Sequence, residues 1–116
     1  MKKTNILKEN KDFKRIMNLN NCYKNKYYLI FIEKNEVIVN HHFGISVSKK
    51  LGNAVVRNKL KRQIKSIIDE KTYQNNFNCI IILRKDILNA SFEEKKENLY
   101  NLLMKVNIIK GDKNEE

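Results

Sequence analysis

Three cations recur at four-residue intervals in the middle of the chain: Arg57, Lys61 and Lys65. On a helix, this spacing places all three along one line of the surface. Like charges at this spacing repel each other by roughly 0.2–0.5 kcal/mol per pair, and residues 48–67 contain no Asp or Glu to offset them. The phosphate backbone of a nucleic acid along this line would turn each repulsion into an attraction. A solvated basic face is the competing interpretation.

The whole chain is strongly basic, with 24 Lys and Arg against 13 Asp and Glu and a formal charge of +11. Its 116 residues are enough for one domain with one core. So much positive charge on a small domain repels itself unless an anionic partner relieves it, and nucleic acid is the first candidate. A lysine-rich surface that only maintains solubility is the alternative.

The sequence contains no recognisable catalytic or metal-binding motif. Its glycines are too scattered for a phosphate-binding loop, and neither a nucleophile elbow nor a spaced carboxylate pair is present. Cys22 and Cys79 lie far apart, which is typical of neither a disulfide framework nor a zinc site. The adjacent His41 and His42 would point to opposite faces of a strand. We therefore expect no catalytic residue, no metal site and no small-molecule substrate for the protein alone.

No apolar run reaches the roughly 20 residues that a membrane span needs. The N-terminus also lacks the apolar segment of a signal peptide, because residues 4–15 are mostly polar and charged. The sequence thus predicts a cytoplasmic protein without a membrane partner.

Amphipathic and β-rich segments must position these residues. Ser46 and Ser48 alternate with apolar residues, which predicts a half-buried strand with the serines facing outwards. An apolar run at 79–83 predicts a strand covered on both faces, and Ser91 with Glu94 predicts a capping box. The predicted order is helix 10–18, strand 23–32, a short strand 36–40, strand 43–47, a helix to about residue 70, strand 79–83 and helix 91–106.

This order defines an α/β protein, in detail an α+β sandwich of the type α-β-β-(β)-α-β-α, whose small central sheet is covered mainly on one face. We expect a single domain over residues 1–116. It should be ordered from about residue 7 to residue 108, with a charged tail at 111–116.

Alternate residues of the first strand offer a second kind of chemistry. Aromatic side chains on one strand face stack the bases of single-stranded nucleic acid at about 1–3 kcal/mol per base. The same face is equally suited to the hydrophobic core, and periodicity alone leaves both interpretations open. The residues of this face are Tyr23, Tyr27, Leu29 and Phe31.

The central segment resembles the signature of the bacterial ribonuclease P protein family. That signature joins a Gly-x-Ser-Val-Ser-Lys-Lys strand to Gly-Asn-Ala-Val, and then to Arg-Asn-Arg and Lys-Arg. Here it stands as GISVSKK at residues 44–50, GNAV at 52–55 and RNKLKR at 57–62. Together with LKENKDF at residues 7–13 and the later strand and helix, the resemblance covers residues 7–106.

The resemblance implies a fold, an activity and partners. The family's sheet contains a left-handed βαβ crossover, which local patterns would not predict because about 98% of such crossovers are right-handed. In the family, a catalytic RNA hydrolyses precursor tRNA with Mg²⁺, and the protein holds the 5′ leader between its first helix and its sheet. The resemblance thus implies the protein subunit of an endoribonuclease that trims precursor tRNA, with the catalytic RNA and precursor tRNA as partners and Mg²⁺ used by the RNA.

The resemblance also implies which residues touch RNA. Three positions depart from the family pattern: Lys59 replaces an arginine, Met17 replaces a phenylalanine, and His42 stands where arginine is common. The expected contacts of the catalytic RNA are Lys49, Lys50, Asn53, Arg57, Asn58, Lys59, Lys61, Arg62 and Lys65. The expected leader cleft consists of Phe13, Met17, Phe31, Ser46 and Ser48.

Two other classes of protein remain open on the residues alone. A different single-domain RNA-binding protein, such as a ribosomal protein, would share the charge and the size. Such a protein, however, is not expected to contain Gly-Asn-Ala-Val and Arg-Asn between a strand and a helix. A standalone nuclease would need the acid–base or metal cluster that the sequence lacks.

Overall fold

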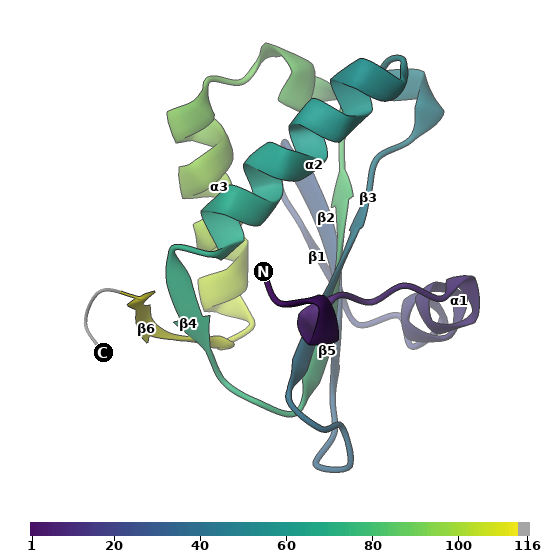
Figure 1. Ribbon diagram of the computed structural model, residues 1–116, viewed down its shortest axis with the longest axis vertical. Helices are drawn as coiled ribbons and strands as arrows, with labels where there is room; N and C mark the ends of the chain where they lie inside the picture. The colour runs from purple at the N-terminus through teal and green to yellow at the C-terminus, as the bar shows by residue number, and fades with distance from the viewer. Residues whose placement is uncertain (114–116) are drawn as a thin grey trace.

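A four-stranded sheet runs through the centre of the computed structural model, which describes residues 1–113 (Figure 1). The sheet has the order β1-β2-β5-β3. The β1–β2 and β2–β5 pairs are antiparallel, whereas β3 and β5 are parallel. The strands are β1 (Cys22–Lys24), β2 (Tyr28–Lys34), β3 (His41–Ser46) and β5 (Phe77–Leu83).

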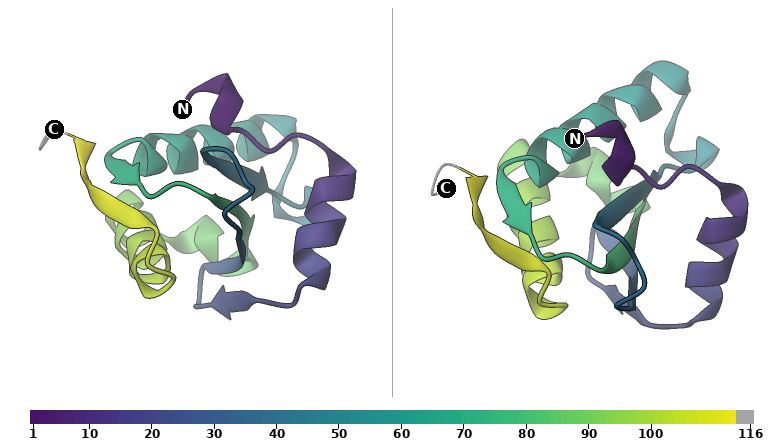
Figure 2. Two further views of the ribbon diagram at one scale, coloured as in Figure 1. Left: turned by 90° about the horizontal axis from the view of Figure 1, so that it is seen from below. Right: turned by 60° about the horizontal axis from the view of Figure 1, so that its bottom comes forward.

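Helices lie on both sides of this sheet. Figure 2 shows α1 and α3 on opposite sides, and α2 shares the core side with α3. The connecting segments contain short helical turns, and β4 and β6 form a separate two-stranded ribbon. The helices are α1 (Asn10–Asn18), α2 (Ala54–Ile68) and α3 (Phe92–Lys105); the short turns are η1 (Lys3–Asn5), η2 (Lys49–Leu51) and η3 (Lys85–Asn89); the ribbon strands are β4 (Lys71–Tyr73) and β6 (Ile109–Asp112).

Alternation along β2 creates the core face of the sheet. Tyr28, Ile30 and Ile32 are buried, and their side chains point to the side of α2 and α3. Across the sheet they pair with Leu83, Ile81 and Cys79 of β5, so one continuous apolar layer forms beneath the two helices. Because β5 is apolar at consecutive positions, it also sends Ile80 to the opposite face, where it is fully buried. The prediction that the strand is covered on both faces therefore holds at Ile80, whereas Ile82 on the same face is only half-buried.

Side-chain caps define where α2 and α3 begin. The Asn53 side chain accepts a hydrogen bond from the Val56 backbone N–H at 3.1 Å. At α3, Ser91 and Glu94 form the predicted capping box, in which each side chain accepts from the other residue's backbone N–H. Because α2 connects the parallel strands β3 and β5, the predicted βαβ unit is present; its handedness stays a prediction.

Two predicted strands differ from the structure. The predicted strand 23–32 is interrupted, because the Asn25 side chain accepts hydrogen bonds from the backbone N–H groups of Tyr27 and Tyr28 and makes a turn between β1 and β2. Residues 36–40 form a loop instead of a short strand. The Asn35 side chain starts this loop by accepting from the Val37 N–H, and Asn40 at φ 64° ends it.

Both ends of the described chain meet at the end of α2. The Met1 ammonium pairs with the Asp69 carboxylate at 2.6 Å. The backbone N–H of Lys113 donates to the Glu70 carbonyl at 3.0 Å. Strand β6 pairs with β4 over a stretch that includes Gly111, where the sequence analysis expects a charged tail. Residues 114–116 of that expected tail lie outside the described part of the chain.

Candidate nucleic-acid interface

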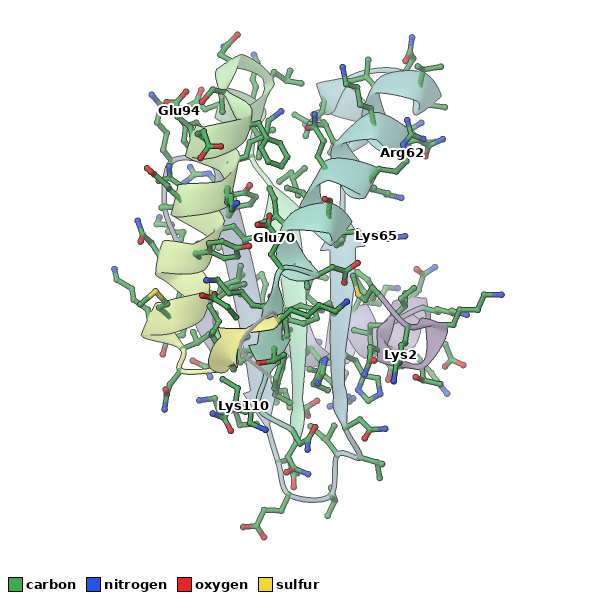
Figure 3. All side chains as sticks on the ribbon, turned by 60° about the vertical axis from the view of Figure 1, so that its left-hand side comes forward. Lys2, Arg62, Lys65, Glu70, Glu94 and Lys110 are labelled. Carbon is green, nitrogen blue, oxygen red and sulfur yellow. The ribbon has the colours of Figure 1, made fainter. Side chains whose placement is uncertain are left out.

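One side of α2 is basic and the other is apolar. Leu60, Ile64 and Ile67 are buried in the core, whereas Val56, on the same side of the helix, is 37% exposed. Beside the buried residues, Arg57, Lys61 and Lys65 are half-buried, whereas Asn58, Lys59 and Arg62 are exposed. In Figure 3, Arg62 and Lys65 point away from α3, to the side where Lys2 and α1 lie.

The positive charge of this segment has no acidic partner within the fold. Among residues 1–113, none of the Lys or Arg side chains from 49 to 65 takes part in a salt bridge. Cations elsewhere do find partners: Lys96 pairs with Glu70 at 2.7 Å, and Arg15 pairs with Glu33. The basic side of α2 therefore presents charge that an external anion would neutralise.

The turn before α2 is organised by its own polar side chains. Arg57 Nε donates to the Gly52 carbonyl at 3.2 Å, which leaves the terminal nitrogens of its guanidinium for another partner. Because Asn53 uses its side-chain oxygen as the helix cap, only its NH₂ group remains for a ligand. Lys49 and Lys50 are exposed in η2, beside this turn.

Ser48 serves the same turn rather than the sheet. Its hydroxyl accepts from the Lys50 backbone N–H at 3.2 Å, and the residue lies beyond the end of β3 at Ser46. The expected leader cleft therefore contains Ser46 on the strand, while Ser48 caps a helical turn at its margin.

The side of the sheet opposite the core is partly open. The register places Phe31 of β2 opposite Ile80 of β5, and Ile80 opposite Gly44 of β3. Phe31 is half-buried, and α1 covers only part of this side. The side chains of this open face are Leu29, Phe31 and Glu33 from β2, Asn78, Ile80 and Ile82 from β5, and His42 and Ser46 from β3.

A close contact between α1 and the open face fixes the position of Phe13. A Cβ atom at Gly44 would lie 2.6 Å from Phe13 Cζ, so the ring sits directly over the glycine backbone. This role of Gly44 was not predicted, although a glycine inside a strand is a recognised signal of close approach. Phe13 and Met17 both belong to α1 and are half-buried, beside the open face.

The structure divides the proposed aromatic face. Tyr27 is buried and donates a hydrogen bond to Glu94 at 3.0 Å. Tyr23 pairs with Ile30, so its side chain lies on the core side of the sheet. Only Leu29 and Phe31 of the four residues reach the open face. The interruption at Asn25 breaks the alternation that would have aligned all four.

A row of hydrogen-bonded polar side chains crosses the lower part of the open face. Arg15 of α1 donates to the Glu33 carboxylate, and the Asn78 NH₂ group donates to the same carboxylate at 2.8 Å. On its other side, the Asn78 oxygen lies 2.8 Å from His42 Nδ1. The Arg15 hydrogen bond holds the pKa of Glu33 below its ordinary value, although burial opposes this. Sequence patterns do not predict this row, because it depends on the register of three strands.

The two histidines lie on opposite faces, as the sequence predicts. His41 packs on the core side against the rings of Phe43, Tyr73 and Phe77, at centroid distances of 5.9, 5.6 and 5.3 Å. His42 faces the polar row. Residues 1–113 contain no group of three or more His, Cys, Asp or Glu side chains placed to hold a metal ion.

Within the described part of the chain, no helix is both long and apolar enough to cross a bilayer.

The α+β fold thus combines the strand order β1-β2-β5-β3, a basic helix in the crossover and a partly open sheet face. The sequence model of the Ribonuclease P family matches residues 1–107. The ribonuclease P protein component of Bacillus velezensis is 38% identical over 111 residues, covering 95% of this chain and 96% of the relative. That of Streptococcus agalactiae is 37% identical, covering 94% and 100%.

Solved structures agree. The Staphylococcus aureus RNase P protein superimposes with a TM-score of 0.79 at 30% identity, covering 90% of this chain and 96% of that one. The Thermotoga maritima RNase P protein gives 0.75 at 30% identity, covering 84% and 93%. This chain belongs to the family of ribonuclease P protein components.

Proposed function

We propose that this protein is the subunit of a ribonuclease P ribonucleoprotein that binds the catalytic RNA through α2 and its preceding turn. The observation that carries the proposal is the unpaired charge of residues 49–65, because a phosphate backbone supplies the anions that the fold lacks. Each phosphate that a Lys or Arg neutralises releases condensed counterions, and this release favours binding.

The open face of the sheet is the proposed site for the 5′ leader of precursor tRNA. Phe13 from α1 and Phe31 from β2 offer rings to unpaired bases, and Ser46 offers a hydroxyl on the neighbouring strand. A stacked base gains about 1–3 kcal/mol with little sequence preference. This face therefore suits a leader whose sequence varies from one precursor to another.

In this proposal the RNA performs the hydrolysis, with the Mg²⁺ ions that it uses, and the protein supplies charge and stacking surface. The expected setting is the bacterial cytoplasm. The protein's contribution is to hold the leader beside the cleaved bond and to neutralise phosphates, so that less Mg²⁺ is needed for the same rate.

The test is a cleavage assay with precursor tRNA and a bacterial ribonuclease P RNA at low Mg²⁺ concentration. We expect the protein to increase the cleavage rate of the RNA and to be inactive alone. The variant Lys110→Ala controls for the loss of one positive charge and should stimulate cleavage as the wild type does. Lys110 is exposed on β6, far from Arg62 and Lys65 in Figure 3. If the wild-type protein fails to stimulate cleavage, the proposed function is wrong.

A further inference from the structure

Lys95 is a buried lysine between α2 and α3. The residue is only 8% exposed. Its ammonium donates to the side-chain oxygen of Gln63 on α2 at 2.9 Å. Its backbone carbonyl accepts from the Tyr28 hydroxyl of β2 at 2.8 Å, which fixes this turn of α3 against the sheet. The backbone of Lys95 is thus held against β2, and its ammonium is directed toward Gln63 of α2.

No acidic side chain among residues 1–113 forms a salt bridge with this ammonium. Burial lowers the pKa of Lys95, and the nearby positive charge of Lys59 lowers it further. The next residue gives a direct comparison, because the hydrogen bond from Lys96 to Glu70 raises the pKa of Lys96. Lysine is rarely buried unless it is paired with an acid, so the placement of Lys95 is unfavourable in the free protein.

The Lys95 ammonium also has hydrogen-bond donors that it does not use within the described part of the chain. A lysine ammonium has three N–H donors. Among residues 1–113, Gln63 is the one acceptor that the Lys95 ammonium reaches. Lys59 is exposed on α2 and forms no salt bridge in the same part of the chain. Two cations and several free donors thus face the same small region between the helices.

We propose that Lys95 and Lys59 together bind a backbone phosphate of the RNA partner, at the surface between α2 and α3. The inference rests on the proposed function and extends it, since it adds a contact on α3 and on the flank of α2 that faces α3. The line of Arg57, Lys61 and Lys65 lies on a different flank. The RNA would then contact both sides of the exposed surface of α2. A phosphate offers several oxygen acceptors and converts the repulsion between the two lysines into attraction to one anion.

The decisive variant is Lys95→Met, with Lys96→Met as the control for loss of one charge at the neighbouring position. Without RNA, Lys95→Met should melt at a higher temperature than the wild type, because a desolvated ammonium is replaced by an apolar side chain of similar length. With ribonuclease P RNA, it should bind about tenfold more weakly, the loss expected for a hydrogen bond to a charged group. The slope of log K against log salt should become shallower by about 0.7–0.9. Lys96→Met should change affinity by less than about twofold.

A second variant separates a binding role from a packing role. Lys95→Arg keeps the charge and should retain binding and the wild-type salt slope. In a double-mutant cycle, Lys59→Met and Lys95→Met should lose less affinity together than the product of their separate losses, because both contact one phosphate. Wild-type affinity in Lys95→Met, or equal losses in Lys95→Met and Lys96→Met, would overturn the inference. Absence of RNA binding by the wild type would instead refute the proposed function as well.

Discussion

The side-chain amide of Asn78 fixes the tautomer of His42. The Asn78 NH₂ group donates to Glu33 at 2.8 Å, so its oxygen must face His42 Nδ1, also at 2.8 Å. An amide oxygen only accepts, and therefore Nδ1 carries the proton. In the neutral ring, Nε2 is then a hydrogen-bond acceptor. His42 also lines a cavity of about 400 Å³ together with residues of the N-terminal segment.

The first prediction follows from this chain of hydrogen bonds. In the wild type, ¹⁵N NMR of the His42 ring should show the Nδ1–H form as the main neutral tautomer. Asn78→Leu removes the acceptor, and the ring should shift toward the Nε2–H form that free histidine favours. The His41 signals serve as an internal control. An unchanged His42 tautomer in Asn78→Leu would contradict the assignment.

The second prediction concerns the basic line on α2. The double variant Arg57→Ala/Lys61→Ala should bind ribonuclease P RNA more weakly, with a salt slope shallower by about 1.4–1.8, as two lost phosphate contacts require. The control is Lys105→Ala/Lys110→Ala, which removes the same charge from exposed positions on α3 and β6. Equal slopes in the two double variants would show that only net charge matters.

Phe13 is the subject of the third prediction. Phe13→Ala should weaken binding of precursor tRNA with a leader by about tenfold, the equivalent of one stacked base, and should hardly affect mature tRNA. Phe92→Ala is the control, because Phe92 is an exposed aromatic residue on α3, across the sheet. Equal losses for precursor and mature tRNA would assign Phe13 a structural role.

Gly44→Ala tests the same contact from the sheet side, as the fourth prediction. The added Cβ would lie 2.6 Å from Phe13 Cζ, so the ring or α1 must move. We expect a loss of stability of about 1–3 kcal/mol, measured by urea unfolding, together with weaker leader binding. In the Phe13→Ala background the ring is absent, so adding Gly44→Ala should cost little further stability. The double variant should therefore be nearly as stable as Phe13→Ala alone. If Gly44→Ala destabilises both backgrounds equally, the contact with Phe13 is not the cause.

A pH dependence of stability is expected from His41. Burial lowers the pKa of His41 from its ordinary value of 6.5, and His41 Nδ1 is buried without a hydrogen-bond partner among residues 1–113. The unfolded chain therefore binds a proton at a higher pH than the folded chain does. The stability that neutral His41 contributes is present above about pH 6.5, and it is lost progressively as the pH falls from that value through the lower pKa of the folded chain.

His41→Phe isolates this contribution. Phe fits the aromatic cluster around His41 and does not titrate, so urea unfolding between pH 7.5 and pH 5 should become nearly independent of pH. Glu33, whose pKa is lowered from 4.5, loses its contribution only at more acidic pH, and does not obscure the comparison. A wild-type pH slope in His41→Phe would exclude His41 as the source.

Local sequence signals were sufficient for the elements that local interactions define. Helix α1 matches the predicted residues 10–18, and the capping box at Ser91 and Glu94 sets the start of α3. The alternation in residues 43–47 correctly places Phe43 in the core and Ser46 on the open side. These features depend on residues within one turn or one strand.

Local sequence signals did not predict features that depend on contacts between residues far apart in the sequence. Strand β4 has only three residues, and it exists because β6 pairs with it from the other end of the chain. Lys95 occupies a position of α3 that the apolar pattern of the helix assigns to the core. Only the packing of α2 against α3 shows that its ammonium is bound by Gln63 and not by an acidic side chain. The basic line on α2 was predicted because its members are close in sequence.

The meeting of both chain ends at the end of α2 has a consequence for the connectivity of the fold. Met1 is held by Asp69, and Lys113 is held by Glu70, the next residue. A short linker could therefore join the ends, while new ends are opened in the exposed loop at 36–39. Such a circular permutant would keep every strand pairing of the sheet. The order in which the elements leave the ribosome is thus separable from the architecture that they reach.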